Sequence, residues 1–377
     1  MNTAEANTAD EQHPDERTGW VIAGAGWVAR DHMAPALASS PTSRVVAVVD
    51  RDLAAATALA DRFPGAQAHD DLQAAFATPG AQVVYVATPN HAHREVALAA
   101  ADAGLAVLCE KPLAADLADA AALVAGCERA GVVAATAFDQ RFHPAHELMA
   151  RAIARGDLGT VTAVRIVYAC WLPPGWAPPG SRTGDNWRID PVRAGGGAYV
   201  DLAPHGLDLV GALLGEDVAT ATTHVQHRVH DYAVDDGSVL VGSTASGVLV
   251  TISNSFNTVE TLPRRRLEVV GTAGQLIATD TMGQEAGGRV EFVDAGTGES
   301  RDLEFDTTTS PFTGELRALE AAVTGGQEWR FPMSRDLRLL NLLHDALGAG
   351  VPQSRPDPVL TAQEVRAQDV RPEEARA

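Results

Sequence analysis

Cysteine is scarce in this sequence of 377 residues, which contains only Cys109, Cys127 and Cys170. The three are widely spaced, and no two of them form a CxxC pair. An odd, sparse set of this kind fits buried thiols in a reducing compartment better than a disulfide framework. Residues 1–17 are polar and acidic and lack the apolar core of a secretory signal. We therefore expect a cytoplasmic protein.

Positive charge is also in short supply, because 29 Lys and Arg residues stand against 49 Asp and Glu residues, giving a formal net charge of −20. Binding to nucleic acid or to an anionic membrane needs clustered basic side chains. Long hydrophobic runs are missing too, since none approaches the roughly 18 apolar residues that span a membrane. The sequence predicts neither a nucleic-acid nor a membrane partner.

Complete sets of metal ligands are lacking as well. His91 and His93 are close in sequence, and His224, His227 and His230 form a second group. In neither group does a cysteine or carboxylate complete a site in sequence. We expect no functional metal site.

The first part of the chain alternates between two patterns. Short apolar runs at residues 20–23, 45–49, 83–87, 106–109 and 132–137 are typical of buried parallel strands. Alanine-rich stretches at 52–62, 92–103 and 115–129 favour helices between them. This alternation predicts an α/β domain over residues 18–140, a Rossmann-type doubly wound parallel sheet. The charged residues 1–17 before it read as a disordered tail.

The pattern changes after residue 140 and predicts an α+β domain over 141–352. A strand is expected at 161–171, and several strand-like segments with glycine turns follow one another between 219 and 303. They predict a largely antiparallel sheet, open on one face or covered by a partner. Flanking helices are expected at 146–155, 198–214, 313–323 and 334–349. The proline-rich residues 353–377 read as a second tail.

A glycine turn follows the first expected strand. Gly24 permits a tight turn, Gly26 lets the backbone approach a pyrophosphate, and Ala29 keeps the next helix close to the sheet. Asp50 ends the second strand, 21 residues past Ala29, close to the spacing of a ribose-binding carboxylate. Its charge favours NAD, although Arg51 could contact the 2′-phosphate of NADP. We expect NAD, with NADP as the alternative.

Two polar segments follow the next strands, at the edge of the sheet where ligands bind. Lys111 comes after the fourth strand and is either a catalytic group or a solvent-exposed lysine. Thr88 and Asn90 come after the third. They could contact the nicotinamide, or Asn90 could simply cap the following helix.

The second domain offers a carboxylate and an imidazole one helical turn apart. Asp201 and His205 follow the triple glycine that begins at Gly195, and in a helix they share one face. A carboxylate beside an imidazole can orient it and raise its basicity. The alternative is a capping or ion pair on a buried helix. Pro204 should bend this helix or remove one hydrogen bond.

The loop at 173–194 is rich in Pro, Gly and Trp. Trp176, Trp187 and Arg188 could present aromatic faces and a cation to a sugar ring. The alternative is a structural loop at the domain junction or an oligomer interface.

Taken together, these motifs resemble the Gfo/Idh/MocA family of oxidoreductases over about residues 18–350. The opening glycine motif extends to His32, the segment from Thr88 to His93 resembles the family's TPNxxH element, and Glu110-Lys111-Pro112 resembles its EKP signature. The triple glycine followed by Asp201 and His205 resembles GGGxxxDxGxH, except that Ala203 replaces the glycine and Pro204 precedes the histidine.

The resemblance implies a role for each site. Lys111 would position and polarise the reacting oxygen, His205 would be the general acid/base, and Asp201 would hold the substrate or orient His205. Asn90 and His93 would line the nicotinamide pocket, with Glu110 beside it. The cofactor-binding residues would be Gly24, Gly26, Trp27, Val28, Asp50, Arg51, Thr88, Asn90, His93, Glu110 and Lys111, and the substrate-binding residues Trp176, Trp187, Arg188, Asp201 and His205.

The expected activity is hydride transfer between nicotinamide and a ring hydroxyl or ketone of a sugar, cyclitol or related polyol. Members of the family commonly form dimers or tetramers through the open sheet. The alternatives are keto-sugar reduction in biosynthesis, transient oxidation that serves an elimination or hydrolysis, and a non-catalytic dinucleotide-binding regulator. The presence of both Lys111 and His205 disfavours the regulator.

Overall fold

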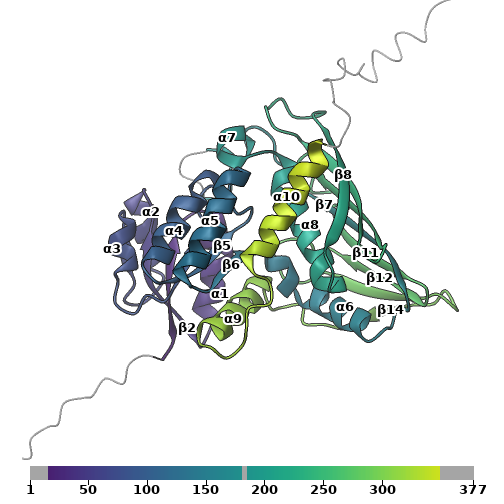
Figure 1. Cartoon of the computed structure of the whole chain (residues 1–377), viewed down its shortest axis with the longest axis horizontal. Coiled ribbons are helices and arrows are strands. Elements are labelled where there is room, and N and C mark those ends of the chain that lie inside the picture. Colours follow the sequence, from purple (N-terminus) through teal and green to yellow (C-terminus); the bar gives the residue numbers. More distant parts are fainter. Residues whose placement is uncertain (1–15, 181–184, 349–377) are drawn as a thin grey trace, which may run out of the picture.

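The computed structural model describes residues 16–180 and 185–348, which form two sheets with their helices (Figure 1). Nearly all of both predicted tails, and residues 181–184 of the Trp-rich loop, lie outside the described residues.

The first sheet has six parallel strands in the order β3-β2-β1-β4-β5-β6. This is the order of a dinucleotide-binding domain and confirms the doubly wound sheet. Five of the strands were expected. The sixth, β3, was missed because its three residues, with glutamine and histidine at the ends, form no apolar run at the sheet edge. The strands are β1 (Thr18–Ala23), β2 (Ser43–Val49), β3 (Gln67–His69), β4 (Val83–Val86), β5 (Ala106–Glu110) and β6 (Ala134–Ala137).

Aspartate caps explain where several helices of this domain begin. The side chains of Asp52, Asp71 and Asp116 accept hydrogen bonds from backbone N–H groups in the first turns of α2, α3 and α5. Gly131, with φ of +68°, ends α5. The helices are α1 (Ala34–Ser39), α2 (Leu53–Ala60), α3 (Leu72–Phe76), α4 (His93–Asp102) and α5 (Leu117–Ala130), with a π-helical turn η1 (Ala29–Met33) before α1 and a 3-10 turn η2 (Asn90–Ala92) before α4.

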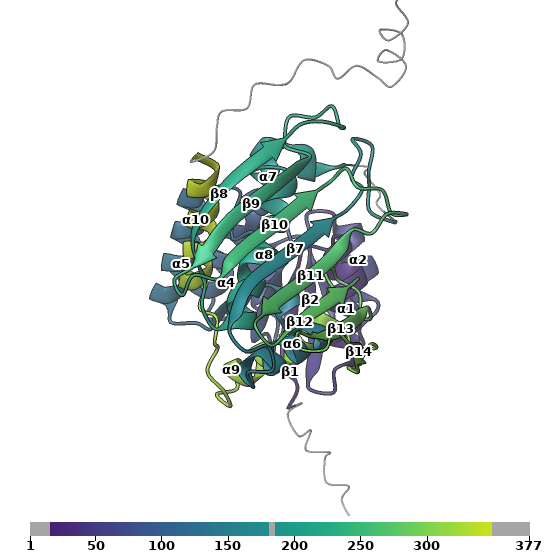
Figure 2. The ribbon, with the colours of Figure 1, turned by 90° about the vertical axis from the view of Figure 1, so that its right-hand side faces the viewer.

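The second sheet has eight strands in the order β14-β13-β12-β11-β7-β10-β9-β8. Neighbours are antiparallel except β7 and β10, which are parallel, so the largely antiparallel sheet is confirmed. Figure 2 looks onto the face that carries no helix. The strands are β7 (Val161–Ala169), β8 (Val218–Gln226), β9 (Gly237–Thr244), β10 (Leu249–Ser255), β11 (Arg265–Gly271), β12 (Gly274–Thr279), β13 (Arg289–Asp294) and β14 (Ser300–Leu303).

Two of the remaining helices, α8 and α10, cover the other face of this sheet. α8 packs on the sheet, and α10 lies between α5 and α8 (Figure 1). In α9, Phe312 and Leu316 share a core with Trp20 of β1, so this helix, expected with the second domain, packs on the first. The elements are η3 (Asp139–Phe142), α6 (Pro144–Ala154), η4 (Trp187–Ile189), α7 (Pro191–Ala194), α8 (Ala198–Leu214), α9 (Pro311–Val323) and α10 (Met333–Gly348).

Across residues 16–180 and 185–348, no helix is both long enough and apolar enough to cross a membrane.

Candidate active site

The glycine turn lies between β1 and β4, where the strand order of the first sheet reverses. Gly24 has φ of +102°, and a Cβ there would lie 2.7 Å from the carbonyl of Ala87, so only glycine fits. A Cβ at Gly26 would meet nothing closer than the same carbonyl oxygen at 3.9 Å. The space before Gly26 is therefore open to a ligand such as a pyrophosphate.

Asp50 braces this turn. Its Oδ2 accepts a hydrogen bond of 2.8 Å from the backbone N–H of Ala25, and its Oδ1 accepts one of 2.9 Å from that of Asp52. The carboxylate thus stands beside the glycine turn, as the sequence predicts, while Arg51 next to it is exposed. Trp27 and Val28 begin the helical segment that continues into η1, and both are half-buried.

The loop after β4 is fixed from two sides. The amide of Asn90 donates to the carbonyl of Ala194, 2.9 Å away, so its side chain does not cap the following helix. The His93 ring lies between the carbonyls of Thr88 and Pro112, each 2.9 Å from a ring nitrogen. Burial lowers the pKa of His93 to about 4, although both carbonyls oppose the shift. In this fully buried position His93 joins the loops after β4 and β5; its role in lining a nicotinamide pocket stays a prediction.

Lys111, which follows β5, connects the two domains. Its Nζ lies 2.6 Å from Oδ1 of Asp201 and 3.1 Å from the carbonyl oxygen of the same residue, on α8. Burial raises the pKa of Asp201, but the positive charges of Lys111 and Arg188 outweigh it, so that pKa lies below its usual value. Lys111 is the chain's only lysine, which places the single ε-ammonium group of the protein in this site.

Glu110, beside the lysine, is tied into the first domain. The hydroxyl of Tyr85 donates to its Oε1 at 2.5 Å, and the backbone N–H of Lys111 lies 3.3 Å from Oε2. Burial raises the pKa of Glu110, against the opposing effect of Lys111. Glu110 therefore lies next to Lys111 and is held by Tyr85 of β4.

His205 is buried on α8, one turn beyond Asp201. The closest carboxylate oxygen to its ring belongs to Asp139, whose Oδ1 lies 3.6 Å from Nδ1. Asp201 instead accepts a hydrogen bond from Lys111. Among the described residues it makes no hydrogen bond to the ring of His205. Burial lowers the pKa of His205 well below its usual value, and the positive charge of Lys111 adds to the shift. Although Pro204 has no N–H to donate, the helix runs unbroken past it.

The triple glycine allows α8 to begin this close to its neighbours. A Cβ at Gly195 would lie 2.2 Å from the carbonyl oxygen of Ala115, and one at Gly197 would lie 2.0 Å from that of Asp235. The Asp235 carboxylate also accepts hydrogen bonds from the backbone N–H groups of Gly197 and Tyr199, at 2.9 and 2.8 Å. It therefore caps α8 from a distant part of the chain.

The Trp-rich loop meets the glycine turn. The rings of Trp27 and Trp176 lie edge to face with centroids 6.1 Å apart. The guanidinium carbon of Arg188 lies 4.7 Å from the centroid of Trp187, 5.5 Å from that of Trp176 and 5.9 Å from that of Trp27. The positive charge of Arg188 opposes the burial effect on the pKa of both Glu110 and Asp201. The loop therefore lies at the domain junction, where it contacts Trp27 of the first domain.

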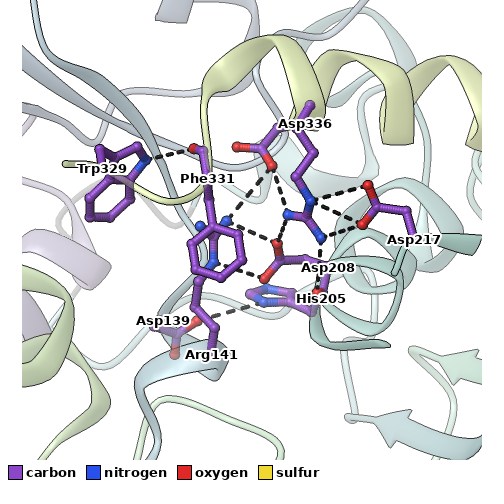
Figure 3. Close-up of polar contacts among 9 residues, drawn as sticks. Asp139, Arg141, His205, Asp208, Asp217, Trp329, Phe331 and Asp336 are labelled. Carbon is purple, nitrogen blue, oxygen red and sulfur yellow. Dashed lines mark hydrogen bonds and ion pairs between the residues drawn. The ribbon is translucent and has the colours of Figure 1, made fainter. Parts of the chain in front are cut away.

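A buried ionic cluster lies beside His205 and supports α8 (Figure 3). The Asp208 carboxylate pairs with both arginines. Its oxygens lie 2.9 and 3.0 Å from Nη2 and Nε of Arg141, and 2.6 Å from Nη1 of Arg335. Arg335 continues to Asp217 at 2.7 Å and to Asp336 at 3.2 Å. The cluster thereby ties η3, α8 and α10 together.

Comparison with known proteins decides the family. Residues 18–138 match the oxidoreductase family with an NAD-binding Rossmann fold, Gfo/Idh/MocA, and residues 146–277 match the C-terminal domain of the same family. The chain belongs to the Gfo/Idh/MocA oxidoreductases. The matches confirm the predicted resemblance and the NAD(P)-binding first domain, and the open space before Gly26 and the braced turn fit that cofactor.

Among relatives, 1,5-anhydro-D-fructose reductase of Ensifer adhaerens is 32% identical over 308 residues, which is 81% of this chain and 88% of that protein. D-xylose 1-dehydrogenase (NADP(+)) 2 of Haloferax volcanii is 31% identical over 85% of this chain and 94% of its own.

Two solved structures share the fold. Aldose-aldose oxidoreductase from Caulobacter crescentus, complexed with glycerol, superposes with a TM-score of 0.78 at 22% identity, covering 89% of this chain and 98% of that one. A 3-ketoreductase from Actinomadura kijaniata in complex with TDP-benzene and NADP superposes with a TM-score of 0.73 at 23% identity and the same coverage.

Sequence reasoning missed three residues that shape the site: Asp139, Asp235 and Arg141. Asp139 carried a usable signal, because it follows β6 at the edge of the sheet where Lys111 follows β5. Asp235 and Arg141 carried none, since their partners are 38 and 67 residues away in sequence.

Proposed function

We propose that this protein transfers a hydride between NAD(P) and a ring hydroxyl or ketone of a sugar, cyclitol or related polyol. The observation that carries the proposal is the meeting of two domains: Lys111 of the first domain pairs with Asp201 of the second at 2.6 Å, and His205 lies one turn further along the same helix. A positive charge and an imidazole at the carboxyl ends of the first sheet are what alcohol oxidation requires.

Each side chain has a separate task. NAD(P), when bound, supplies the hydride or accepts it. Lys111 binds the reacting oxygen and stabilises the negative charge that develops there. His205 exchanges the hydroxyl proton, and its neutral ring, kept uncharged by burial, is ready to accept that proton. Asp201 holds the ammonium group of Lys111 in place.

The loop residues Trp176, Trp187 and Arg188 bind the substrate in this proposal. Indole faces suit the C–H faces of a sugar ring, and the guanidinium group donates hydrogen bonds to hydroxyl oxygens. Their packing against Trp27 supports a ligand held between the loop and the cofactor. Thr88, Asn90, His93 and Glu110 shape the nicotinamide side.

For the cofactor, NAD is the preferred form. The Asp50 carboxylate beside the glycine turn accepts hydrogen bonds and repels the 2′-phosphate of NADP. Arg51 is exposed next to it and is the residue through which NADP would be accommodated.

The same residues serve oxidation of a hydroxyl and reduction of a keto-sugar, so this geometry supports both directions of the reaction. The relatives are named as both reductases and dehydrogenases. A non-catalytic dinucleotide-binding regulator is the alternative from another class, and it would need neither Lys111 nor His205.

In the cell we propose a cytoplasmic homo-dimer or homo-tetramer that pairs through the open sheet. Apolar side chains stand exposed on this sheet: Val167 at 38%, Val239 at 43%, Val241 at 49% and Leu249 at 63%. Three cysteines without a disulfide fit a reducing compartment. Sedimentation velocity of the wild type and of Val241→Lys, which places a charge on this face, tests the pairing.

The function is tested with a panel of cyclitols and sugars, assayed with both cofactors by absorbance of the reduced nicotinamide. Turnover is expected for the wild type, and Lys111→Ala should reduce it on the order of 10²–10⁴-fold. An amine-reactive reagent should inactivate the enzyme through Lys111, since only the chain's amino terminus competes with it. Cofactor binding without turnover on any substrate, in either direction, would instead identify a regulator.

A further inference from the structure

His205 needs a partner that Asp201 does not provide. Its side chain is 2% exposed, and among the described residues neither ring nitrogen has a hydrogen-bond partner. The ring touches Phe138 and Tyr168 edge-on, with centroids 5.9 and 5.5 Å away. When such a ring accepts a proton, the resulting charge is buried and needs a nearby anion.

Asp139 is placed to supply that anion. Its Oδ1 lies 3.6 Å from Nδ1 of His205, while Gln140 donates to its Oδ2 at 3.0 Å. Because Oδ2 is engaged elsewhere, Oδ1 is the oxygen left for the ring. The separation is too long for a hydrogen bond in this state, but contacts between catalytic groups commonly tighten once ligands bind.

The position of Asp139 is imposed by the scaffold. Arg141, in the same 3-10 turn, grips Asp208, which lies three residues after His205 on α8 (Figure 3). The Gln140 side chain donates to the carbonyl of Gly283 at 2.7 Å and accepts from the backbone N–H of the same residue at 3.1 Å. The contact between Arg141 and Asp208 therefore fixes the turn of Asp139 against the helix of His205. It leaves Oδ1 of Asp139 and Nδ1 of His205 available to each other.

From this geometry we infer that Asp139 is the positioning residue of His205, and that it shares the proton the imidazole exchanges with the substrate. In oxidation, the substrate O–H bond breaks as the proton moves to Nε2 of His205, and the hydride leaves the carbinol carbon for the cofactor. Nδ1–H then donates to Oδ1 of Asp139, whose carboxylate balances the imidazolium charge. Reduction runs the same transfers in reverse. The inference rests on the proposed function.

Several charged and titratable groups face the pair. Burial and, to a smaller extent, the charge of Glu110 raise the pKa of Asp139 to about 7, against the opposing effects of Lys111 and Gln140. Five other titratable or charged groups interact electrostatically with Asp139, with His205 or with one another: Tyr85 on β4, Arg141 in η3, Tyr168 on β7, Asp201 on α8 and Glu315 on α9. The pair therefore loses a proton close to neutral pH.

The expected pH dependence follows from that ionisation. Once Asp139 is ionised, Nδ1 of His205 carries the ring proton and Nε2 is free to accept the substrate's. In the oxidation direction kcat should therefore rise with pH through about 7 and then level off.

The test compares Asp139→Asn with the wild-type enzyme on the substrate that the panel identifies. We expect kcat to fall about 100-fold, with KM changed less than about threefold, because Asp139 acts on the proton and not on binding. The rise of kcat near pH 7 should vanish and leave a flat profile. Asp139→Glu, which keeps the carboxyl group, should recover part of the rate together with the pH step.

Glu315→Gln is the matched control. Glu315 is fully buried near Asp139, burial raises its pKa well above the usual value, and among the described residues neither carboxyl oxygen has a hydrogen-bond partner. Burial therefore favours the neutral carboxyl group, and the amide of glutamine has nearly the same shape. This variant should keep both the rate and the pH step.

The outcomes separate the two proposals. If Asp139→Asn keeps the wild-type rate, or loses rate but keeps the pH step, Asp139 does not share the proton and the inference fails while the proposed function stands. If the wild type turns over no substrate, the proposed function fails and takes the inference with it. Thermal denaturation and affinity for the reduced cofactor confirm that each variant is folded. If Asp139→Asn does not fold, Asp139→Glu becomes the test: its pH profile of kcat must still show the step, moved along the pH axis, for the inference to hold.

Discussion

Replacing Asp208 by Asn should destabilise the protein severely, because this carboxylate is the only fully buried anion that contacts both Arg141 and Arg335 at 3 Å or less in the described part of the chain. The side chain of Asp208 is 0% exposed, that of Arg141 1% and that of Arg335 8%. The substitution keeps the shape and removes the charge.

Removing one partner of a buried ion pair typically costs about 3–5 kcal/mol, because the remaining charge is left without compensation. Arg141 loses its closest anion here and Arg335 loses one of its partners, but Asp336 can compensate in part. Burial and repulsion from Asp208 raise the pKa of Asp336 to about 7, although Arg141 and Arg335 oppose the shift. Without Asp208 that pKa should fall, so we expect a loss near the lower end of the range, about 3 kcal/mol. This is a large share of the about 5–15 kcal/mol that a domain has.

The pH dependence of this loss has a definite sign. In the wild type the raised pKa of Asp336 contributes stability that is complete only below the ordinary carboxyl value of 3.8 and is lost as pH rises to about 7. The variant lacks most of this effect because its Asp336 is already ionised. The difference in stability should therefore be greater at pH 6 than at pH 8.

Urea denaturation of the cofactor-free protein, followed by tryptophan fluorescence at both pH values, measures the loss. Asp217→Asn is the control, since Asp217 pairs with the same Arg335 but is 33% exposed, and exposed pairs contribute about 0–1 kcal/mol. Equal losses for the two variants, or a loss below about 1 kcal/mol for Asp208→Asn, would refute the reasoning about the buried cluster.

Three further predictions concern the site. Asp50→Ala should weaken NAD binding more than NADP binding, measured by fluorescence titration, since the ribose-binding carboxylate is gone; an unchanged preference would mean that the ribose is recognised elsewhere. Gly197→Ala should lower the melting temperature by several degrees, because its Cβ would lie 2.0 Å from the carbonyl oxygen of Asp235; an unshifted transition would contradict the tight start of α8. Lys111→Ala should leave cofactor affinity nearly intact while turnover is lost, and a parallel fall in both would make Lys111 a binding residue.

The first domain was largely predictable because its signals are local. Apolar runs bounded by turns mark buried parallel strands, and all of the expected runs form strands in the described structure. The missed strand β3 is short and lies at the sheet edge, where burial does not impose an apolar pattern. The helix α9 was found, but its packing against β1 was not, because amphipathic spacing states which face is buried and not against what.

In the candidate site, too, the residues were predictable from local motifs, whereas their contacts were not. Lys111, Asp201 and His205 could be named from motifs, yet which carboxylate faces which cation is a matter of three-dimensional placement. Asp201 lies one turn from His205 in sequence but pairs with a lysine 90 residues away. Asp139 comes from the other domain and meets the imidazole only after α8 has packed. Contacts of this kind depend on tertiary packing and leave no periodic trace in the sequence.

A crystal structure with the reduced or oxidised cofactor and a reactive polyol is the most direct test of the account. We predict that the oxygen being oxidised lies within hydrogen-bond distance of both Nζ of Lys111 and Nε2 of His205, with its carbon facing the nicotinamide. A reacting carbon that faces the nicotinamide with neither side chain near its oxygen would contradict the account.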